Sequence, residues 1–267
     1  MQEPSALGRI VELVRDLRNR CAWDGAQTKE SLRPYLMEEV CELDYAIGRG
    51  DADAIKVELG DLLLHLAFQI VLAEERGEFG TEDLTSAVEQ KMWRRHPHLF
   101  PDRVPAQQGQ EDERQLSAHE QWERRKLAES DAERPGVLDG LPPTMPALVM
   151  AYRLQQRAAG VGFDWPDAQG PLEKVREETE EITREMRAAP DEERVQAEVG
   201  DLLFAAVNLA RKLGCDPRAA LEGANDRFRG RFRALEHLAA ERGIDVGRAD
   251  LETLDGLWNE VKGRAAR

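Results

Sequence analysis

The chain has 267 residues, of which 41% are hydrophobic and 33% charged, with a formal net charge of −15 at pH 7. These values are typical of a globular protein with one large or two ordinary domains. Because an acidic surface repels phosphate backbones, they argue against a nucleic-acid polymer as a partner, but a small phosphorylated ligand with a bound cation is compatible with them.

The sequence also argues against a membrane or secreted location. The opening residues lack the pattern of a signal peptide, and the longest apolar run, residues 62–73, is too short to span a bilayer. The three cysteines show no CxxC spacing, which is typical of a reducing compartment. We therefore expect a cytoplasmic protein that binds no membrane.

Helical periodicity dominates the chain from its start, and no segment shows the alternation of a strand. Apolar residues recur at i, i+3 and i+4 in one early and one later segment, at Leu7, Ile10, Val11, Val14 and Leu17 and at Leu59, Leu62, Leu63, Leu66 and Ile70. The sequence therefore predicts an all-α fold. We expect 62–73 to be a buried helix and His65 to be a hydrogen-bonded histidine of the core.

Proline and glycine are concentrated near the middle of the chain, in ERPGVLDGLPPTMP (133–146). Such a composition is typical of a linker between domains. We expect an N-terminal domain over 1–132, a linker over 133–147 and a C-terminal domain over 148–267.

An internal repeat relates the two halves. The segment VELGDLLLHLAFQIVLAEERG (57–77) reappears as AEVGDLLFAAVNLARKLG (197–214), and EExxE occurs before each copy. The other matched pairs are Trp23-Asp24 with Phe163-Asp164, Lys91 and Arg95 with Arg227 and Arg231, and Trp122 and Lys126 with Trp258 and Lys262. We interpret the chain as a tandem duplication of an all-helical unit.

Each copy carries acidic residues on two predicted helices. Because successive residues of a helix turn by roughly 100°, Glu38, Glu39 and Glu42 share one face, and Glu58 and Asp61 share a face of the next helix. Between these helices, residues 45–53 supply glycines for a helix end and aspartates for a new N-cap. A tight turn would bring the two acidic faces together, and Glu177, Glu178, Glu181, Glu198 and Asp201 repeat the pattern.

Converging carboxylates repel one another unless a cation lies between them. Oxygen ligands without histidine or cysteine favour Mg²⁺, with Mn²⁺ as a substitute, over zinc. A solvated helix surface is the alternative for either copy alone. The apolar neighbours of the acids and the survival of the pattern in both copies favour the metal site.

These motifs resemble the MazG family of nucleoside triphosphate pyrophosphohydrolases. The resemblance rests on EExxE followed by ExxD, on CAWD and VGFDW before them, and on RRHPHLF (94–100) and VNLARKLG (207–214). It extends over nearly the whole chain and implies the two-domain bacterial form, with tandem MazG-like domains and active sites of the four-helix-bundle type. The family is Mg²⁺-dependent and usually dimeric, so the resemblance implies a homodimer.

The resemblance also implies roles for the acidic residues. The metal ligands would be Glu178, Glu181, Glu198 and Asp201 in the second copy, and Glu39, Glu42, Glu58 and Asp61 in the first. Glu177 and Glu38 would orient or deprotonate the attacking water, and which carboxylate is the base stays open.

Basic residues near the second copy resemble the family's phosphate-contacting positions, although each could be an ordinary surface charge. They are Lys174, Arg194, Arg227, Arg231 and Lys262, with Lys91 and Arg95 in the first copy. Trp258 resembles the residue that closes over the nucleotide, and core packing is its alternative. Because Tyr35 and Ala54 replace Lys174 and Arg194 in the first copy, we expect a catalytic C-terminal domain. Gln196 and Ala197 depart from the family pattern before Glu198, which puts substrate contacts there in doubt.

The expected reaction converts NTPs or dNTPs to monophosphates and diphosphate, with broad base preference and a role in controlling or cleaning nucleotide pools. One alternative is a narrower pyrophosphohydrolase for dUTP or phosphoribosyl-ATP. A second is a helical nucleotide or metal sensor without turnover. For the N-terminal domain, weak metal binding, dimerisation and regulation all stay open.

Overall fold

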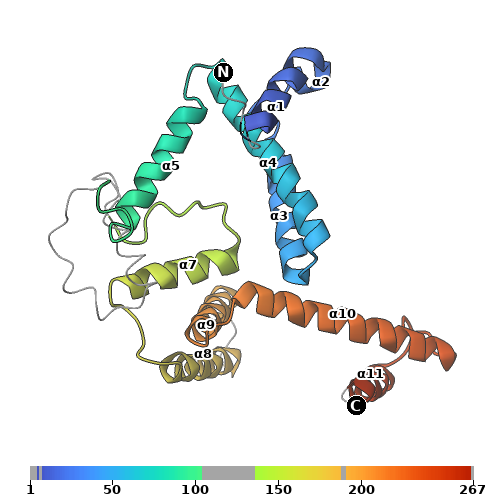
Figure 1. Ribbon diagram of the computed structural model, residues 1–267. Coiled ribbons are helices and arrows are strands. Elements are labelled where there is room, and N and C mark those ends of the chain that lie inside the picture. The colour runs from blue at the N-terminus through green and yellow to red at the C-terminus, as the bar shows by residue number, and fades with distance from the viewer. Residues whose placement is uncertain (1–4, 6–7, 104–135, 188–190, 266–267) are drawn as a thin grey trace. The chain divides into compact units, whose positions relative to one another are not determined.

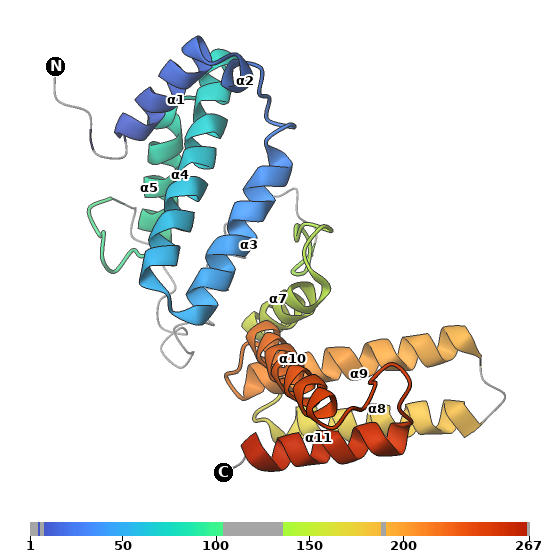
Figure 2. The ribbon, with the colours of Figure 1, turned by 90° about the vertical axis from the view of Figure 1, so that its right-hand side faces the viewer.

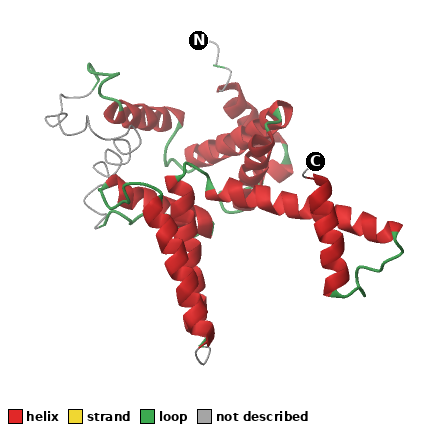
Figure 3. Cartoon of the chain, turned by 90° about the horizontal axis from the view of Figure 1, so that it is seen from below, coloured by secondary structure: helices red, strands yellow, loops and turns green. Residues whose placement is uncertain are grey.

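The computed structural model describes residues 5, 8–103, 136–187 and 191–265. Within these ranges the chain forms ten helices and no strand, which confirms the predicted all-α class (Figure 3). None of the helices in these ranges combines the length and apolar character needed to cross a membrane.

The chain divides into two compact units, residues 1–110 and 111–267. The predicted boundary at 132 and the start of the predicted linker lie outside the described ranges, as do Trp122 and Lys126 of the repeat. The predicted division into an N-terminal domain, a linker and a C-terminal domain therefore stays a prediction.

Among its described residues the first unit contains five helices, which Figures 1 and 2 show in blue to green. They are α1 (Gly8–Arg20), α2 (Ala22–Gly25), α3 (Arg33–Arg49), α4 (Ala52–Glu75) and α5 (Thr81–Arg95). Helices α3 and α4 form an antiparallel hairpin, and α1 packs against α4 (Figure 2). This hairpin carries the first acidic pattern.

The core of the first unit lies between α1, the start of α3 and the second half of α4. Its buried residues are Val11, Val14, Leu32, Ala67, Phe68, Val71 and Leu72. The apolar run 62–73 is therefore only partly a buried helix, because Leu66 is 48% exposed. Helix α4 buries the side that meets α1, whereas Leu59 and Leu66 of the predicted leucine stripe are about half exposed.

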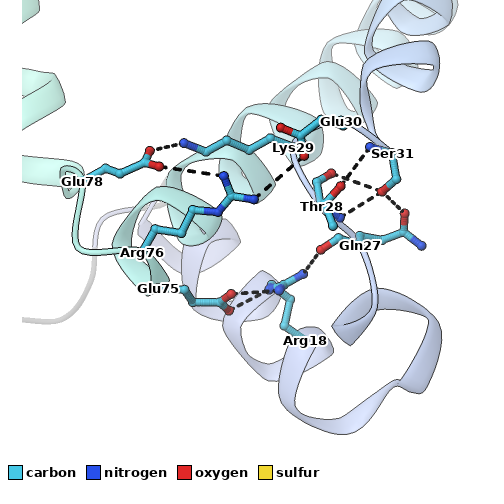
Figure 4. A network of polar contacts seen from close by, with 9 residues as sticks. All are labelled: Arg18, Gln27, Thr28, Lys29, Glu30, Ser31, Glu75, Arg76 and Glu78. Carbon is cyan, nitrogen blue, oxygen red and sulfur yellow. Dashed lines mark hydrogen bonds and ion pairs between the residues drawn. The ribbon is translucent and has the colours of Figure 1, made fainter.

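A polar network ties the loop before α3 to the end of α4 (Figure 4). The Arg18 guanidinium donates to both carboxylate oxygens of Glu75, at 2.7 and 2.8 Å, and to the backbone oxygen of Gln27 at 3.1 Å. Lys29 pairs with Glu78 in the same network. These contacts fix where α3 begins relative to α4.

The second unit contains another five helices among its described residues. They are α7 (Ala147–Gly160), α8 (Gln169–Arg187), α9 (Glu192–Lys212), α10 (Pro217–Glu241) and α11 (Leu251–Ala265). Helices α8 and α9 form the second hairpin, α7 packs against α9, and α11 packs against α10. The buried residues between α10 and α11 are Leu235, Leu238, Ala239, Leu257 and Val261.

Local signals close the two hairpins. Gly50 ends α3 in the left-handed region at φ 67°, and Asp51 caps α4 by accepting the backbone N–H of Ala54. Asp191 caps α9 in the same way, through the N–H of Glu193. The predicted helix stop and new N-cap of the first hairpin are confirmed.

Candidate active site

Each hairpin brings carboxylates from both of its helices together. In the first unit the group is Glu39, Glu42 and Glu58, and in the second it is Glu178, Glu198 and Asp201. One oxygen from each residue lies within 4.8 Å of one from each of the other two. We call these groups the first and second clusters.

The two remaining predicted ligands, Asp61 and Glu181, lie outside these groups of three but close enough to act on them electrostatically. Burial, followed by the negative charges of Asp61, Glu42, Glu58 and Glu38, raises the pKa of Glu39. Burial raises the pKa of Glu198 in the second cluster, and Glu181 and Glu178 raise it further. All four expected ligands of each copy thus surround a common region.

The residues present fit a bound divalent cation. The clusters offer hard oxygen ligands. Burial, and after it the neighbouring carboxylates, raises the pKa of Glu39 and of Glu198, and a cation would relieve both effects. In the second cluster, Glu178 is buried and its Oε2 atom has no hydrogen-bond partner. A buried carboxylate oxygen without a partner is costly unless an ion or donor reaches it.

Lys174 supplies the second cluster with a positive charge from one turn earlier on α8. Its Nζ atom lies 2.6 Å from Glu178 Oε1 and 3.0 Å from Glu177 Oε1. Hydrogen bonds to Glu178 and then Glu177 raise the pKa of Lys174. The lysine is therefore fully charged and is held against the predicted metal ligand.

His65 takes a place beside the first cluster that the sequence reading missed. Its Nε2 atom lies 3.8 Å from Glu39 Oε1, its Nδ1 atom is buried without a partner, and its ring stacks on Tyr35. The expectation of a hydrogen-bonded core histidine is wrong. Asp61 precedes His65 by four residues, so helical spacing already placed the imidazole on the acidic face.

The other predicted phosphate-contacting residues are spread over the structure. Arg194 is exposed and lies 3.7 Å from Asp191. Within the described ranges, no ion pair joins Arg227, Arg231 or Lys262 to the second cluster, or Lys91 to the first. Among the predicted cations of the second unit, Lys174 is the one with an ion pair to the second cluster in the described ranges.

Trp258 packs within the second unit, not over the second cluster. It lies against the core between α10 and α11, and its ring centroid is 5.3 Å from that of Phe228. Core packing was the alternative considered for this residue. The closing role implied by the resemblance stays a prediction.

A cavity of about 660 Å³ adjoins the second cluster. Glu178, Asp201 and Lys174 line one part of it. The rest is lined mainly by apolar and aromatic residues with a few polar ones, including Leu154, Gln155, Phe163, Trp165, Phe204, Ala205, Asn208 and Arg211. Phe163 and Trp165 belong to the VGFDW motif, and the sequence by itself indicates no role for the others.

The first cluster adjoins a different cavity, of about 440 Å³, at the turn of its hairpin. Glu42 and Glu58 line it together with Cys41, Tyr45 and Arg49. The Arg49 side chain donates to the Tyr45 hydroxyl at 3.2 Å and lies over its ring. The two copies therefore surround similar carboxylates with different neighbours.

The chain is similar in sequence to proteins of a known family. The MazG nucleotide pyrophosphohydrolase domain family matches residues 27–100, which hold the first cluster. A nucleoside triphosphate pyrophosphohydrolase of Escherichia coli K12 is 40% identical over 264 residues, 98% of each chain. The nucleoside triphosphate pyrophosphohydrolase/pyrophosphatase MazG of Thermotoga maritima is 40% identical over 95% of this chain and 94% of its own.

A third relative is longer than this chain. The uncharacterized protein YabN of Bacillus subtilis is 43% identical over 94% of this chain, which corresponds to 50% of its own length. The similarity to the E. coli and T. maritima proteins extends through both acidic hairpins. The chain belongs to the MazG nucleotide pyrophosphohydrolase family.

Proposed function

We propose that the protein is a Mg²⁺-dependent nucleoside triphosphate pyrophosphohydrolase. It converts NTPs and dNTPs to monophosphates and diphosphate, with broad base preference, and controls or cleans nucleotide pools in the cytoplasm. The observation that carries this proposal is the second cluster with Lys174 held against Glu178 beside a cavity. The names of the E. coli and T. maritima relatives support it.

The metal would be held by Glu178, Glu181, Glu198 and Asp201, and in the first unit by Glu39, Glu42, Glu58 and Asp61. Mg²⁺, or Mn²⁺ in its place, would neutralise phosphate charge and lower the pKa of bound water. The orphaned Oε2 atom of Glu178 and the raised pKa of Glu198 favour occupancy of the second cluster.

The chain's own residues supply the remaining chemistry. The water oxygen attacks the α-phosphorus in line, the bond from that phosphorus to the diphosphate oxygen breaks, and a carboxylate accepts the water proton. Glu177 is the proposed acceptor in the second unit and Glu38 its counterpart in the first. Lys174 would donate to a phosphate oxygen once cations relieve its contact with the carboxylates.

We assign the reaction to the C-terminal unit. Lys174 contacts the second cluster, whereas the uncharged Tyr35 stands at the corresponding position of the first copy. The second cluster also adjoins the larger cavity. The N-terminal unit would bind metal weakly, or serve dimerisation or regulation.

We also propose a homodimer. Apolar side chains next to both clusters are about half exposed in the single chain, including Val40, Val57, Leu59, Val199 and Leu203. A two-helix hairpin buries too little apolar surface to be stable alone, and a second copy would complete a four-helix arrangement around the acids. Arg227 and Arg231, exposed or half-buried on α10, would then be open to phosphates.

The test is release of diphosphate from each of four NTPs and four dNTPs, with Mg²⁺ and with EDTA, by the full chain. The proposal expects turnover of several nucleotides with Mg²⁺ and none with EDTA. Turnover of one nucleotide alone would favour the narrower enzyme. Binding without any release would favour a sensor and would overturn the proposal.

A further inference from the structure

Part of the predicted linker borders the cavity beside the second cluster. Leu138, within the stretch 133–146 that is rich in proline and glycine, lines this cavity together with Glu178, Asp201 and Lys174. The volume of the cavity falls within the roughly 300–1,000 Å³ of small-molecule sites. We call residues 136–140 the strap, because they lie across part of the lining of this cavity.

The strap has a fixed backbone conformation. The N–H of Asp139 donates to the backbone oxygen of Gly136 at 3.1 Å, which closes a turn that contains Leu138. Gly140 follows in the left-handed region, at φ 78°, which glycine adopts without strain. Pro142 and Pro143 restrict the chain directly after it. The strap therefore has little conformational freedom to lose when a ligand contacts it.

Arg157 on α7 holds the strap against the second unit. This residue is 5% exposed, and its guanidinium donates to the backbone oxygen of Asp139 at 2.5 Å and to that of Val137 at 3.5 Å. The two oxygens flank Leu138, so one side chain fixes the strap on both sides of this leucine. Because a buried guanidinium is costly unless oxygens accept its hydrogen bonds, Arg157 and the strap depend on each other for their positions.

The loop after α7 is held by an ion-pair clamp of different residues. The Asp164 carboxylate accepts hydrogen bonds from Arg211 and Lys212, and Lys212 also donates to the backbone oxygen of Trp165 at 2.6 Å. Trp165 and Leu138 both line the cavity. Two non-helical segments of the lining are thus fixed, each by contacts of its own.

Leu138 is 46% exposed although the backbone around it is fixed. Packing within the unit thus leaves nearly half of the leucine in water, and a ligand in the cavity can cover it. Because charged and apolar residues line the same cavity, a ligand that fills it meets both kinds. A nucleoside triphosphate suits this lining, since it joins a charged phosphate chain to an uncharged nucleoside.

We propose that Leu138 packs against the nucleoside part of the triphosphate, and that Arg157 is the positioning residue that holds the strap for this contact. A leucine side chain offers a phosphate no hydrogen bond, so its partner is the uncharged part of the ligand. The assignment rests on the proposed function. It makes the end of the predicted linker a part of the substrate site.

The first experiment tests Leu138 with the nucleoside triphosphate that the wild type uses best. It measures KM and kcat for monophosphate formation, and the inhibition constant of tripolyphosphate, which carries phosphates without a nucleoside. Leu138→Ala should raise KM about fivefold, the size expected for uncovering roughly half a leucine, with kcat changed less than about twofold. Tripolyphosphate should inhibit the wild type and this variant with the same inhibition constant.

The matched control is Leu221→Ala. Leu221 is 49% exposed and does not line the cavity, so this variant should keep the wild-type KM. An unchanged KM in Leu138→Ala, or an equal rise in KM and in the inhibition constant, would overturn the contact between Leu138 and the nucleoside. Absence of inhibition by tripolyphosphate in the wild type would overturn the division of the ligand between cations and Leu138.

The second experiment tests whether Arg157 acts through Leu138. Arg157→Met should raise KM at least as much as Leu138→Ala, and Arg157→Lys, which keeps a cationic donor, should raise it less. The double variant Leu138→Ala/Arg157→Met should have nearly the KM of Arg157→Met, because a contact that is already lost cannot be lost again. If Arg157→Met does not fold, the same comparison is made with Arg157→Lys.

Effects on KM that multiply in the double variant would overturn the positioning role of Arg157. Each of these failures leaves the proposed function standing, because monophosphate is still formed. If the wild type forms no monophosphate from any nucleoside triphosphate, the proposed function fails, and the assignment of Leu138 and Arg157 fails with it.

Discussion

In the first cluster Glu39 lies 3.8 Å from His65, whose ring stacks on that of Tyr35, whereas in the second cluster Glu178 lies 2.6 Å from the charged Lys174. In the repeat, Lys174 stands where the first copy has Tyr35, and Ala205 stands where it has His65. Ala205 and Lys174 both line the larger cavity.

Two substitutions thus distinguish the copies at the site. Tyr35 and His65 stack on each other, with ring centroids 6.4 Å apart, and occupy the space beside the first cluster. The smaller Ala205 and the flexible Lys174 leave the corresponding space of the second copy open to a ligand. The comparison teaches that a duplicated set of carboxylates can be kept while the neighbouring residues decide where a ligand fits.

The largest expected effect comes from removing the charge of Glu178, a proposed metal ligand, and the matched change is made at Glu39 in the first cluster. Glu178→Gln should lower kcat/KM for diphosphate release at least about 100-fold, because the second cluster loses a ligand charge that the proposed reaction requires. Glu39→Gln, its matched control at the equivalent position, should lower it less than about threefold. Steady-state kinetics with saturating Mg²⁺ checks both. A large loss in Glu39→Gln alone would place the chemistry in the first unit.

Removing the lysine that distinguishes the second cluster should have the next largest effect. Lys174→Met should lower kcat/KM about 10- to 100-fold, since one phosphate-directed cation is lost. It should also lower the free energy of unfolding without metal by about 1 kcal/mol, a modest value because Lys174 is 41% exposed.

The matched control for this lysine is Arg176→Met, which removes an exposed cation from the same helix. In steady-state kinetics and in chemical denaturation, this variant should behave like the wild type. If Arg176→Met lost as much activity as Lys174→Met, general surface charge, and not the contact with Glu178, would explain the effect.

The pH dependence of metal stabilisation should separate the clusters from ordinary surface acids. The pKa values of Glu39, Glu58 and Glu198 are raised, so without metal their contribution to stability is present below the ordinary glutamate pKa and lost as pH rises through the folded value. Mg²⁺ binds the charged form, so its effect should grow in the same pH window. We expect the Mg²⁺-induced rise in Tm to be several degrees at pH 7 and to shrink towards pH 4.

Scanning calorimetry of the wild type and of Glu198→Gln, with Mg²⁺ and with EDTA, measures this effect. Glu198→Gln should keep part of the Mg²⁺-induced rise in Tm, because its first cluster is intact. A Mg²⁺ effect that did not change between pH 4 and pH 7 would argue against binding by these carboxylates.

The smallest effects should come from the clamps at the far end of each hairpin. Glu75→Gln removes the ion pair with Arg18 and should lower the free energy of unfolding by about 1 kcal/mol without changing kcat/KM. Hydrogen bonding to Arg18 lowers the pKa of Glu75, so this contribution is present above the ordinary glutamate pKa and lost as pH falls through the lowered value.

Asp164→Asn tests the corresponding clamp of the second unit, which holds Trp165 beside the cavity. This variant should lower the free energy of unfolding by a similar amount. It should also raise KM about three- to tenfold, with kcat changed less, because the loop that lines the cavity beside the second cluster loosens. Chemical denaturation and steady-state kinetics measure the two effects. Equal kinetics in Glu75→Gln and Asp164→Asn would argue against a positioning role for Asp164.

Local spacing was enough to predict the helices, the turn at Gly50 and Asp51, and the shared face of the acids. These features depend on residues a few positions apart, where helix geometry and capping leave few alternatives. The internal repeat predicted a second hairpin of the same kind. The same spacing would have placed His65 with Asp61, and that signal was outweighed by its leucine neighbours.

Other features depend on which helices meet, and the sequence by itself left them open. The half exposure of Leu66, the stacking of His65 on Tyr35 and the burial of Glu178 follow from packing between helices far apart in sequence. The contact between Gln155 on α7 and Phe204 on α9 likewise joins residues that no periodicity relates. The sequence alone thus determined which carboxylates share each helical face, because helical faces follow from local geometry. Tertiary structure alone decided which cluster adjoins a large cavity, since a cavity is the space that side chains from several helices fail to fill.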